Sequence, residues 1–462
     1  MKTSRCIWSA SAIRVVYLRL PAIVLLGLSA VSALAQSTIR EPTSELIPCG
    51  KFSSVFLRQQ DIRYGEQPPT HVGLMAARWS TLQLSLAGYQ RTGVRLVGWD
   101  GSRLVPAEYK DDSGFDFFIP PLASAFRLSL AKSVDFFIGG ILISGYLLGL
   151  IGLLLLFKSW WARCLAIFEV LLLAVLCLRI GDVYVVQSSI AMAAIPWVLY
   201  FSRKWQSEWQ FPFFLVLGVA LGISNFVRAQ SGTTVLMFCL PLLAFYGDTS
   251  PKRRVLLLAS LLAGSAASTL YFRHAFVVRD AYIQSHQSDY LPAPRQHPVW
   301  HSVYIGLGFV SNPYVPGGYC DQVGVDKVHS LSPNTAFLSP EYDRILAQQV
   351  YQLAKSHPSV LMINLAAKLG ILQLLALLAG NVGLLAAIWY RKPLSLDVAF
   401  WMAVGFGALP GLLAVPTPSY VLGAITVLVL YGLVSADHAL EEGAGRVLSG
   451  IFSSPGKAVC AA

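Results

Sequence analysis

Long apolar segments, separated by short turns, constrain the fold of this chain more than any other feature of its sequence. Nine such segments lie between residues 134 and 436, although several are shorter than the ~20 residues that an upright membrane-spanning helix needs. We predict membrane spans at about 134–157, 163–180, 187–201, 211–226, 232–246, 254–272, 359–389, 396–415 and 419–436. Apolar residues make up 55% of the chain and charged residues only 13%, which excludes an ordinary soluble protein.

Basic residues occupy the short turns between these segments. The net charge of the chain is +11. The turns hold Lys158, Arg163, Arg203, Lys204, Lys252, Arg253, Arg254, Arg391 and Lys392. Basic short loops mark the cytoplasmic side of a multi-pass membrane protein, whereas a nucleic-acid-binding protein gathers its basic residues on one face. We therefore expect no nucleic-acid partner, and a location in a bacterial-type inner (plasma) membrane.

The alternation of the spans predicts which polar stretches lie outside the cytoplasm. If the span at 134 begins outside, every basic turn lies inside. The same count places 179–187, 224–231, 273–358 and 416–420 outside. Because the inside turns are too short to hold a nucleotide site, we expect the active face to be extracytoplasmic.

The N-terminal part of the chain is less apolar. Residues 1–36 contain four basic residues and then an apolar run that ends in small residues, which is typical of a signal peptide or an uncleaved signal anchor. Residues 37–133 contain three runs of alternating apolar and polar side chains, at 82–86, 93–99 and 126–130, separated by turn residues. Such alternation is typical of half-buried strands. We predict a small extracytoplasmic β-sandwich-like domain here.

The predicted fold is an all-α polytopic membrane bundle of about nine or ten transmembrane helices, with the β-rich domain near its N-terminus. The first part of the bundle covers 134–272 and the second part covers 359–436. Between them, 273–358 forms a large extracytoplasmic loop, which we expect to be ordered because it is rich in Trp, Tyr and His. Residues 437–462 are predicted to be a cytoplasmic tail.

One acidic residue lies where the second and third spans meet on the outside. Ionisable groups at membrane level are energetically costly and tend to be functional. Arg179, Asp182 and Tyr184 lie together at this turn. Asp182 is a candidate general base or cation ligand, and Arg179 and Tyr184 are candidates for substrate binding. The alternative is that Asp182 only caps the following helix, as Asp often does.

Two basic residues are candidates for binding an anion. Arg228, with Ser231 close behind it, suits a phosphate or pyrophosphate; the alternative is an interfacial arginine that reaches to lipid headgroups. Lys368 lies about nine residues inside a span, which is ~13 Å deep at ~1.5 Å per residue. We expect it to face a polar cavity and to pair with Asp182 or a substrate phosphate. Glu169, nearer the cytoplasmic end, is interpreted as a structural partner for a neighbouring helix.

Histidines and aromatic residues of the large outer loop are further candidates for substrate binding. His297 and His301 are four residues apart, which on a helix places both on one face. Trp300 and Tyr304 lie beside them in the sequence, and Asp321 follows in the same loop. Histidines that are hydrogen-bonded within an aromatic-rich loop are the commoner arrangement, and this is the alternative to a binding role.

The sequence requires no cofactor. His297 and His301 could bind a divalent cation together with Asp321 or Asp326, but no spacing typical of a structural zinc site occurs. Cys49 and Cys320 are the two cysteines of the outside segments. A disulfide between them fits the oxidising compartment, and a coincidence fits equally well.

One stretch of the chain resembles a known family. Gly218–Tyr246 contains Gly-x-x-x-Gly, a downstream Arg, then Ser-Gly and an apolar span that ends before a basic turn. This is similar to a recurrent pattern of the GT-C superfamily of polytopic glycosyltransferases. Asp182 resembles the family's catalytic carboxylate in its placement at an outer turn, and the long outer loop after several more spans matches as well. The resemblance covers roughly 160–436 and depends on topology and placement.

The resemblance implies a membrane glycosyltransferase of cell-envelope polysaccharide biosynthesis. It would move a sugar from a polyprenyl-phosphate carrier to an extracytoplasmic glycan or lipid acceptor, and its partners would be that carrier-linked sugar, the acceptor and membrane lipids. Asp182 would deprotonate the acceptor hydroxyl, and Arg228 and Lys368 would stabilise the phosphate. His297, His301 and the loop aromatics would shape the sugar and acceptor pockets.

Three other functions are compatible with the same residues. A polysaccharide polymerase or ligase would share the carrier lipid and the outer site but transfer an oligosaccharide. A transporter or flippase of lipid-linked saccharide would use Lys368, Glu169 and Arg228 as a path across the bilayer. Against transport, the polar residues cluster toward the outer half and no inverted repeat is visible. A non-enzymatic assembly factor would bind polysaccharide through the β-rich domain.

Overall fold

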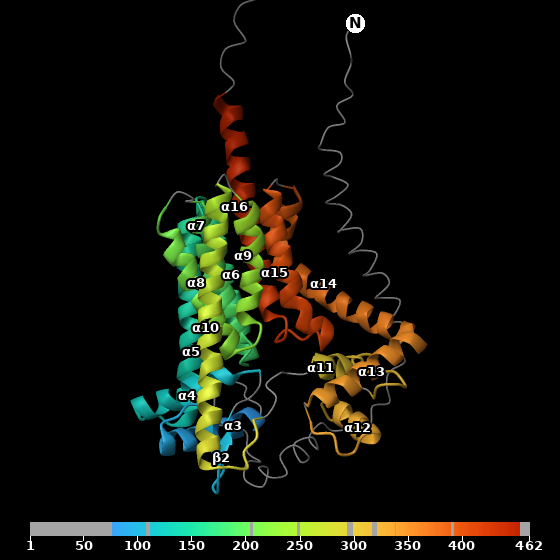
Figure 1. Ribbon diagram of the computed structural model, residues 1–462. Coiled ribbons are helices and arrows are strands. Elements are labelled where there is room, and N and C mark those ends of the chain that lie inside the picture. The colour runs from blue at the N-terminus through green and yellow to red at the C-terminus, as the bar shows by residue number, and fades with distance from the viewer. Residues whose placement is uncertain are drawn as a thin grey trace, which may run out of the picture.

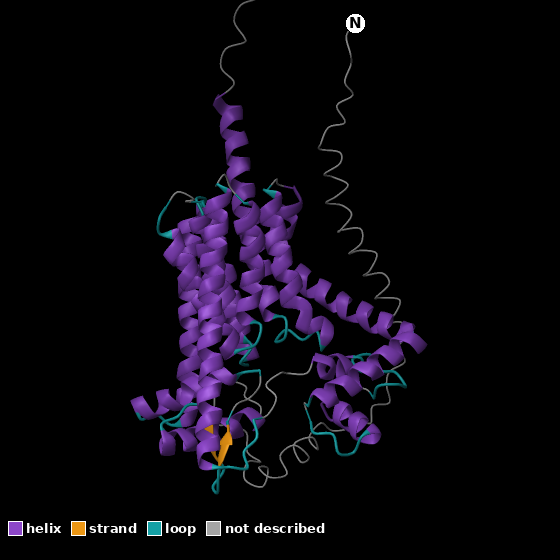
Figure 2. Cartoon of the chain, in the orientation of Figure 1, coloured by secondary structure: helices purple, strands orange, loops and turns teal. Residues whose placement is uncertain are grey.

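The computed structural model is a bundle of helices with helical additions at one end (Figures 1 and 2). It describes residues 76–107, 111–203, 207–246, 250–292, 299–316, 321–337, 339–389 and 392–452. The elements are α3 (Ala76–Thr92), β1 (Val97–Trp99), β2 (Leu104–Pro106), α4 (Ser113–Phe126), α5 (Leu130–Leu156), α6 (Trp160–Ile180), α7 (Val185–Ser202), α8 (Gln210–Val227), α9 (Ser231–Phe245), α10 (Pro251–His286), α11 (Val299–Gly306), α12 (Asp321–Leu331), α13 (Pro340–Ser356), α14 (Pro358–Trp389), α15 (Leu394–Leu413) and α16 (Leu422–Phe452).

The predicted spans form helices. Within the described residues, eight helices are long and apolar enough to cross a membrane: α5, α6, α7, α8, α10, α14 up to Asn381, α15 and the first part of α16. The remaining predicted span forms α9, an apolar helix of 15 residues. The chain is therefore a multi-pass membrane protein built as a polytopic helical bundle.

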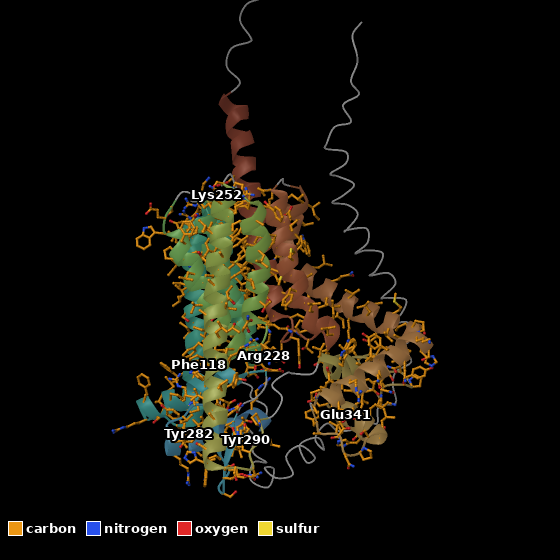
Figure 3. The ribbon with its side chains drawn as sticks, in the orientation of Figure 1. Phe118, Arg228, Lys252, Tyr282, Tyr290 and Glu341 are labelled. Carbon is orange, nitrogen blue, oxygen red and sulfur yellow. The ribbon has the colours of Figure 1, made fainter. Side chains whose placement is uncertain are left out.

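Among the short basic turns, the one that holds Lys252 lies at the end of the bundle opposite to Arg228 (Figure 3). Arginines of these turns donate to the last carbonyls of neighbouring helices. Arg203 Nη1 donates to the Leu156 carbonyl at 2.7 Å, and Arg254 Nη1 donates to the Ala244 carbonyl at 2.7 Å. A cation at a helix C-terminus satisfies free carbonyls and complements the helix dipole.

Glycines allow α8 and α10 to approach closely. A Cβ added to Gly218 would lie 2.1 Å from the Leu261 carbonyl oxygen, and a Cβ added to Gly264 would lie 2.1 Å from the Leu215 carbonyl oxygen. Small residues at such crossings are a recurrent basis of helix packing in membranes. The pairing fixes α10 against α8, and α8 ends directly before Arg228.

The helix α14 departs from regular geometry at Asn381, which has φ 35° and ψ −130°. Asn381 Nδ2 donates to Glu169 Oε1 of α6 at 2.8 Å, which confirms the prediction that Glu169 is a structural partner for a neighbouring helix. Figure 1 shows α14 running obliquely from the bundle toward α13.

The prediction of a β-sandwich-like domain was wrong over the described residues 76–107 and 111–133. Residues 82–86 belong to α3, and 126–130 contain the end of α4 and the start of α5. Strands β1 and β2 form a two-stranded antiparallel hairpin in which Val97 is paired with Pro106. In α3 the side chains of Leu82 and Ser85 are buried, which is helical spacing, so the local alternation was misleading.

The long polar segment 273–358 is largely helical where the structure describes it. Its first part continues α10 as far as His286. Helices α11, α12 and α13 then form a small unit whose core contains Tyr304, Val328, Tyr342 and Leu346. The predicted signal segment 1–36 and the cysteines Cys49 and Cys320 lie outside the described residues.

Candidate functional site

The end of α8, the start of α9 and the start of α4 meet around a buried arginine, toward the end of the bundle opposite to Lys252 (Figure 3). Arg228 follows the last residue of α8 and precedes α9, and its side chain is 7% exposed. Its Nη1 donates to Asp112 Oδ1 at 2.7 Å. The same nitrogen lies 3.6 Å from Asp111 Oδ2, which exceeds hydrogen-bond distance. The site therefore joins α8 to the start of α4.

A second arginine shares the carboxylate of Asp112. Arg78 Nε, from α3, donates to Asp112 Oδ2, and Asp112 is fully buried. The backbone of α4 is held at the same place, because the Ala229 N–H donates to the Asp111 carbonyl at 2.9 Å. A Cβ on Gly114 would lie 2.5 Å from Val227 Cα. Three helices thus converge on one buried carboxylate with a positive charge on either side.

An aromatic pair closes one side of Arg228. The guanidinium lies over the Tyr184 ring, 4.1 Å from its centroid, and Tyr184 packs on Tyr420 with ring centroids 4.7 Å apart. Such stacking leaves the N–H groups in the guanidinium plane available to other partners. Burial raises the pKa of Tyr184 above its ordinary value, so its phenol stays protonated at neutral pH.

Asp182 lies beside these groups in the turn between α6 and α7. Burial raises the pKa of the Asp182 carboxyl, while the positive charges of Arg78 and Arg228 act in the opposite direction. Its Oδ1 accepts the N–H of the adjacent Val183. Helix α7 begins after Tyr184 without a side-chain cap, so Asp182 does not make the helix cap that was the alternative to a functional role. A half-buried carboxylate next to two arginines can take part in proton transfer.

Two polar groups of the site are buried without a hydrogen-bond partner. They are Arg228 Nε and Ser231 Oγ, and Ser231 is fully buried. The start of α9 is otherwise satisfied, because Asn225 Oδ1 accepts the N–H groups of Gly232 at 2.8 Å and Thr233 at 3.0 Å. Buried polar groups are nearly always paired in native proteins, so these two groups are the unsatisfied hydrogen-bonding groups of the site.

The structure does not bring Lys368 to Asp182. Lys368 is buried, and its Nζ donates to the Leu412 carbonyl at 3.0 Å, at the last turn of α15. The free carbonyls of a helix C-terminus carry partial negative charge, so they stabilise the ammonium in place of the predicted anion. No described carboxylate forms an ion pair with Lys368. Arg179 is exposed in the last turn of α6.

The predicted residues of the outer loop connect α11, α12 and α13. His301 is buried, with its Nδ1 2.9 Å from Tyr342 Oη and its Nε2 3.1 Å from Asp321 Oδ1. Tyr304 is buried in the same core, and Trp300 packs on Tyr351 with ring centroids 5.2 Å apart. This is the alternative arrangement, in which hydrogen-bonded histidine organises an aromatic-rich loop. His297 lies outside the described residues.

Sequence reasoning missed Arg78, Asp111 and Asp112. All three lie in the segment that was interpreted as β-rich. The signal that was present is a pair of carboxylates directly before an apolar helix, in an outer segment. The local sequence does not show which residue pairs with Asp112, because Asp112 and Arg228 are 116 residues apart. Of the predicted site residues, the structure gathers Asp182, Tyr184, Arg228 and Ser231.

Comparisons with known proteins add one distant likeness. No protein-family model matches the chain, and no curated protein matches it. The crystal structure of the Archaeoglobus fulgidus oligosaccharyltransferase in its apo form is similar with a TM-score of 0.42 and 13% identity, over 94% of this chain and 52% of that one. The chain is distantly similar to an archaeal oligosaccharyltransferase. This chain spans about half the length of that protein.

Proposed function

We propose that this protein is a membrane glycosyltransferase that moves a sugar from a polyprenyl-phosphate carrier to an extracytoplasmic glycan or lipid acceptor. The observation that carries the proposal is the buried Arg228 beside Asp182, with Arg228 Nε and Ser231 Oγ both lacking partners. A phosphate oxygen is an acceptor of the kind that a guanidinium N–H binds strongly. The half-buried carboxylate of Asp182 lies next to Arg228, as a general base for the acceptor hydroxyl requires.

The charges of the site support a phosphate. Arg78 and Arg228 share the single fully buried carboxylate of Asp112, so two guanidiniums lie at the proposed phosphate site. Asp111 is 27% exposed and lies 3.6 Å from Arg228 Nη1, so solvent screens its attraction to the arginine more than that of the buried Asp112. Charge-assisted hydrogen bonds from a guanidinium to phosphate are among the strongest in proteins.

In the proposed reaction, the acceptor hydroxyl gives its proton to the Asp182 carboxylate. The acceptor oxygen forms a bond to the anomeric carbon, and the bond from that carbon to the carrier phosphate breaks. The electron pair of the broken bond remains on the phosphate, whose growing charge Arg228 stabilises. Each step above is assigned to side chains of the site.

The arrangement of the intramembrane polar residues gives less support to transport. Lys368 donates to α15 carbonyls, Glu169 accepts from Asn381, and Arg228 is paired with Asp112. Each residue of the supposed path thus has its own separate partner.

Substitution of Arg228 by lysine tests the phosphate contact. The ammonium can still pair with Asp112, but it lacks the forked donors and the Nε–H. We expect kcat/KM for the carrier to fall about 10- to 100-fold, since one hydrogen bond to a charged group contributes about 1.5–3 kcal/mol. The measurement is the rate at which membranes carrying equal amounts of protein remove labelled sugar from a polyprenyl-phosphate carrier.

The matched control is Arg127→Lys, which changes an exposed arginine at the end of α4. This variant should keep the wild-type rate. If Arg228→Lys had the wild-type kcat/KM while the same amount of protein was inserted in the membrane, the proposed contact between Arg228 and the carrier phosphate would be contradicted.

A further inference from the structure

The structure has a pocket that is separate from the Arg228 site. It has a volume of about 620 Å³ and is lined by the end of α3, the β1–β2 hairpin and the end of α10. Figure 3 places Tyr282, one of its lining residues, farther from the basic end of the bundle than Arg228. Pockets of roughly 300–1,000 Å³ are the usual size for small ligands, so this one can hold a short saccharide segment.

The walls of the pocket are held together by a small apolar cluster. Val97 of β1, Leu104 of β2 and Ile283 of α10 pack against one another and are buried. Gly88 lets α3 approach the hairpin, because an added Cβ would lie 2.0 Å from the Val97 carbonyl oxygen. The hairpin is therefore fixed between α3 and α10, and the pocket does not depend on a loose loop.

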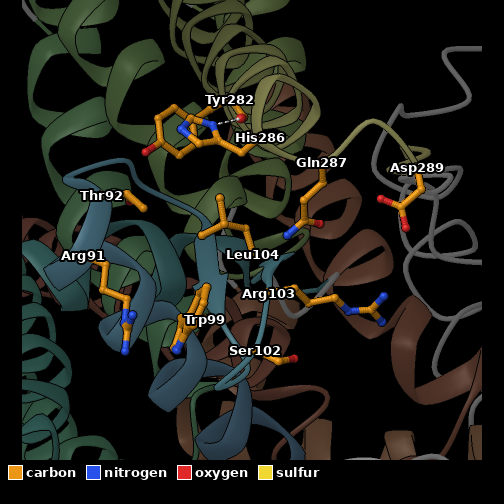
Figure 4. Close-up of a pocket in the computed structure, with 10 residues that line it drawn as sticks. All are labelled: Arg91, Thr92, Trp99, Ser102, Arg103, Leu104, Tyr282, His286, Gln287 and Asp289. Atoms are coloured by element: carbon orange, nitrogen blue, oxygen red, sulfur yellow. Dashed lines mark hydrogen bonds between the residues drawn. The ribbon is translucent and has the colours of Figure 1, made fainter.

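Aromatic and basic side chains face each other across the pocket. Figure 4 shows Tyr282 and His286 on one side, and Arg91 and Trp99 on the other. The Arg91 guanidinium lies 4.2 Å from the Trp99 ring centroid, which leaves its in-plane N–H groups available to a ligand. Arg103 contacts Asp100 at 3.4 Å with 59% of its side chain exposed, and an exposed pair of this kind is weak.

His286 presents one ring nitrogen to the pocket region. Its Nδ1 lies 2.8 Å from the Tyr282 carbonyl oxygen, and since a carbonyl only accepts, Nδ1 carries the proton. In this tautomer the other ring nitrogen, Nε2, is an acceptor and suits a hydroxyl group. Among the described residues that line the pocket, Asp289 is the one that is acidic, against the two arginines Arg91 and Arg103.

We propose that this pocket binds an acidic saccharide segment of the acceptor, at a distance from the reacting hydroxyl. The inference depends on the proposed function and names the acceptor class. Arginines would pair with the carboxylates of the saccharide, His286 and the aromatic surfaces would contact its hydroxyls and ring faces, and the protein would use this remote binding energy to position the acceptor.

Binding of trigalacturonate to the full-length protein in detergent tests the proposal, with neutral maltotriose as the comparison ligand. Titration calorimetry should show tighter binding of trigalacturonate. The double variant Arg91→Gln with Arg103→Gln should bind it at least tenfold more weakly, because both cations are lost. Arg127→Gln, outside the pocket, should bind like the wild type. Equal affinity for the two trisaccharides, no binding by the wild type, or wild-type affinity in the double variant would overturn the proposal.

This experiment can fail separately from the proposed function. Binding is measured without turnover. If an inactive protein still prefers trigalacturonate, the proposal for the pocket stands and the proposed glycosyltransferase function fails. If the protein turns over its carrier but shows no preference for trigalacturonate, the proposed function stands and the assignment of this pocket to an acidic acceptor fails.

Discussion

Replacement of Asp182 by asparagine is expected to slow sugar transfer about 10²- to 10⁴-fold, the usual contribution of a positioned general base. The amide has nearly the same shape as the carboxylate but cannot take the acceptor proton. Because the amide leaves Arg228 in place, KM for the carrier should change little while kcat falls. The measurement is the initial rate of loss of label from a polyprenyl-phosphate sugar in membranes with equal amounts of protein.

The pKa of Asp182 adds a pH dependence to this prediction. Burial raises this pKa, with Arg78 and Arg228 opposing the rise, so the rate should fall on acidification at a higher pH than for an ordinary aspartate. Arg78→Gln removes one opposing charge and should move this acidic limb to still higher pH. A carboxyl with a raised folded pKa contributes stability when protonated, and this contribution is lost as pH rises through the folded pKa. The neutral variant Asp182→Asn should therefore fold.

The control for Asp182 is Glu341→Gln on α13. Glu341 is 56% exposed and lies away from Arg228 in Figure 3, so its removal should leave the rate and the pH profile unchanged. If Asp182→Asn transferred sugar at the wild-type rate with the wild-type acidic limb, another group would have to be the base.

Replacement of Asp112 by alanine is expected to destabilise the protein by about 3–5 kcal/mol, because breaking a buried ion pair leaves uncompensated buried charge. Asp112 is fully buried, and it accepts from both Arg78 and Arg228. Its removal leaves two arginines facing each other at the junction of α3, α4 and α8. The measurement is the free energy of unfolding in mixed micelles that contain increasing amounts of a denaturing detergent.

A double variant separates this charge effect from lost packing. Arg78→Met added to Asp112→Ala removes one of the two unpaired charges, so the double variant should be more stable than the sum of the single changes. Glu341→Ala, which removes an exposed carboxylate, should cost less than about 0.5 kcal/mol. Additive losses in the double variant, or an unchanged free energy for Asp112→Ala, would contradict the role given to the buried carboxylate.

The membrane part of the fold could be predicted because its signal is local. A span requires a continuous apolar stretch whatever its neighbours are, so residues 134–436 give the helices directly. The basic turns could be predicted for the same reason. Asp182 and Arg228 stood out as ionisable residues at the ends of apolar segments, and the structure places them in one site.

The remaining parts depend on contacts between distant residues. Residues 82–86 alternate like a strand but form a helix, because packing of α3 against α4 and β1 buries Leu82 and Ser85. The partner of Lys368 is a set of backbone carbonyls at the end of α15. No pattern of side chains in the sequence predicts such a partner. The roles of Arg78 and Asp112 depend on the packing of α3, α4 and α8 against one another, so they could not be predicted from the local sequence.

The most direct test of the central claim follows the labelled sugar itself. Purified protein in proteoliposomes would be given a polyprenyl-phosphate carrier with a radiolabelled sugar, and membrane-derived glycan as acceptor. We predict that label leaves the carrier and appears in the acceptor, with free polyprenyl phosphate formed in equal amount, and that Asp182→Asn nearly abolishes both. Label that crosses the bilayer but stays on its carrier would contradict the account and would identify a transporter.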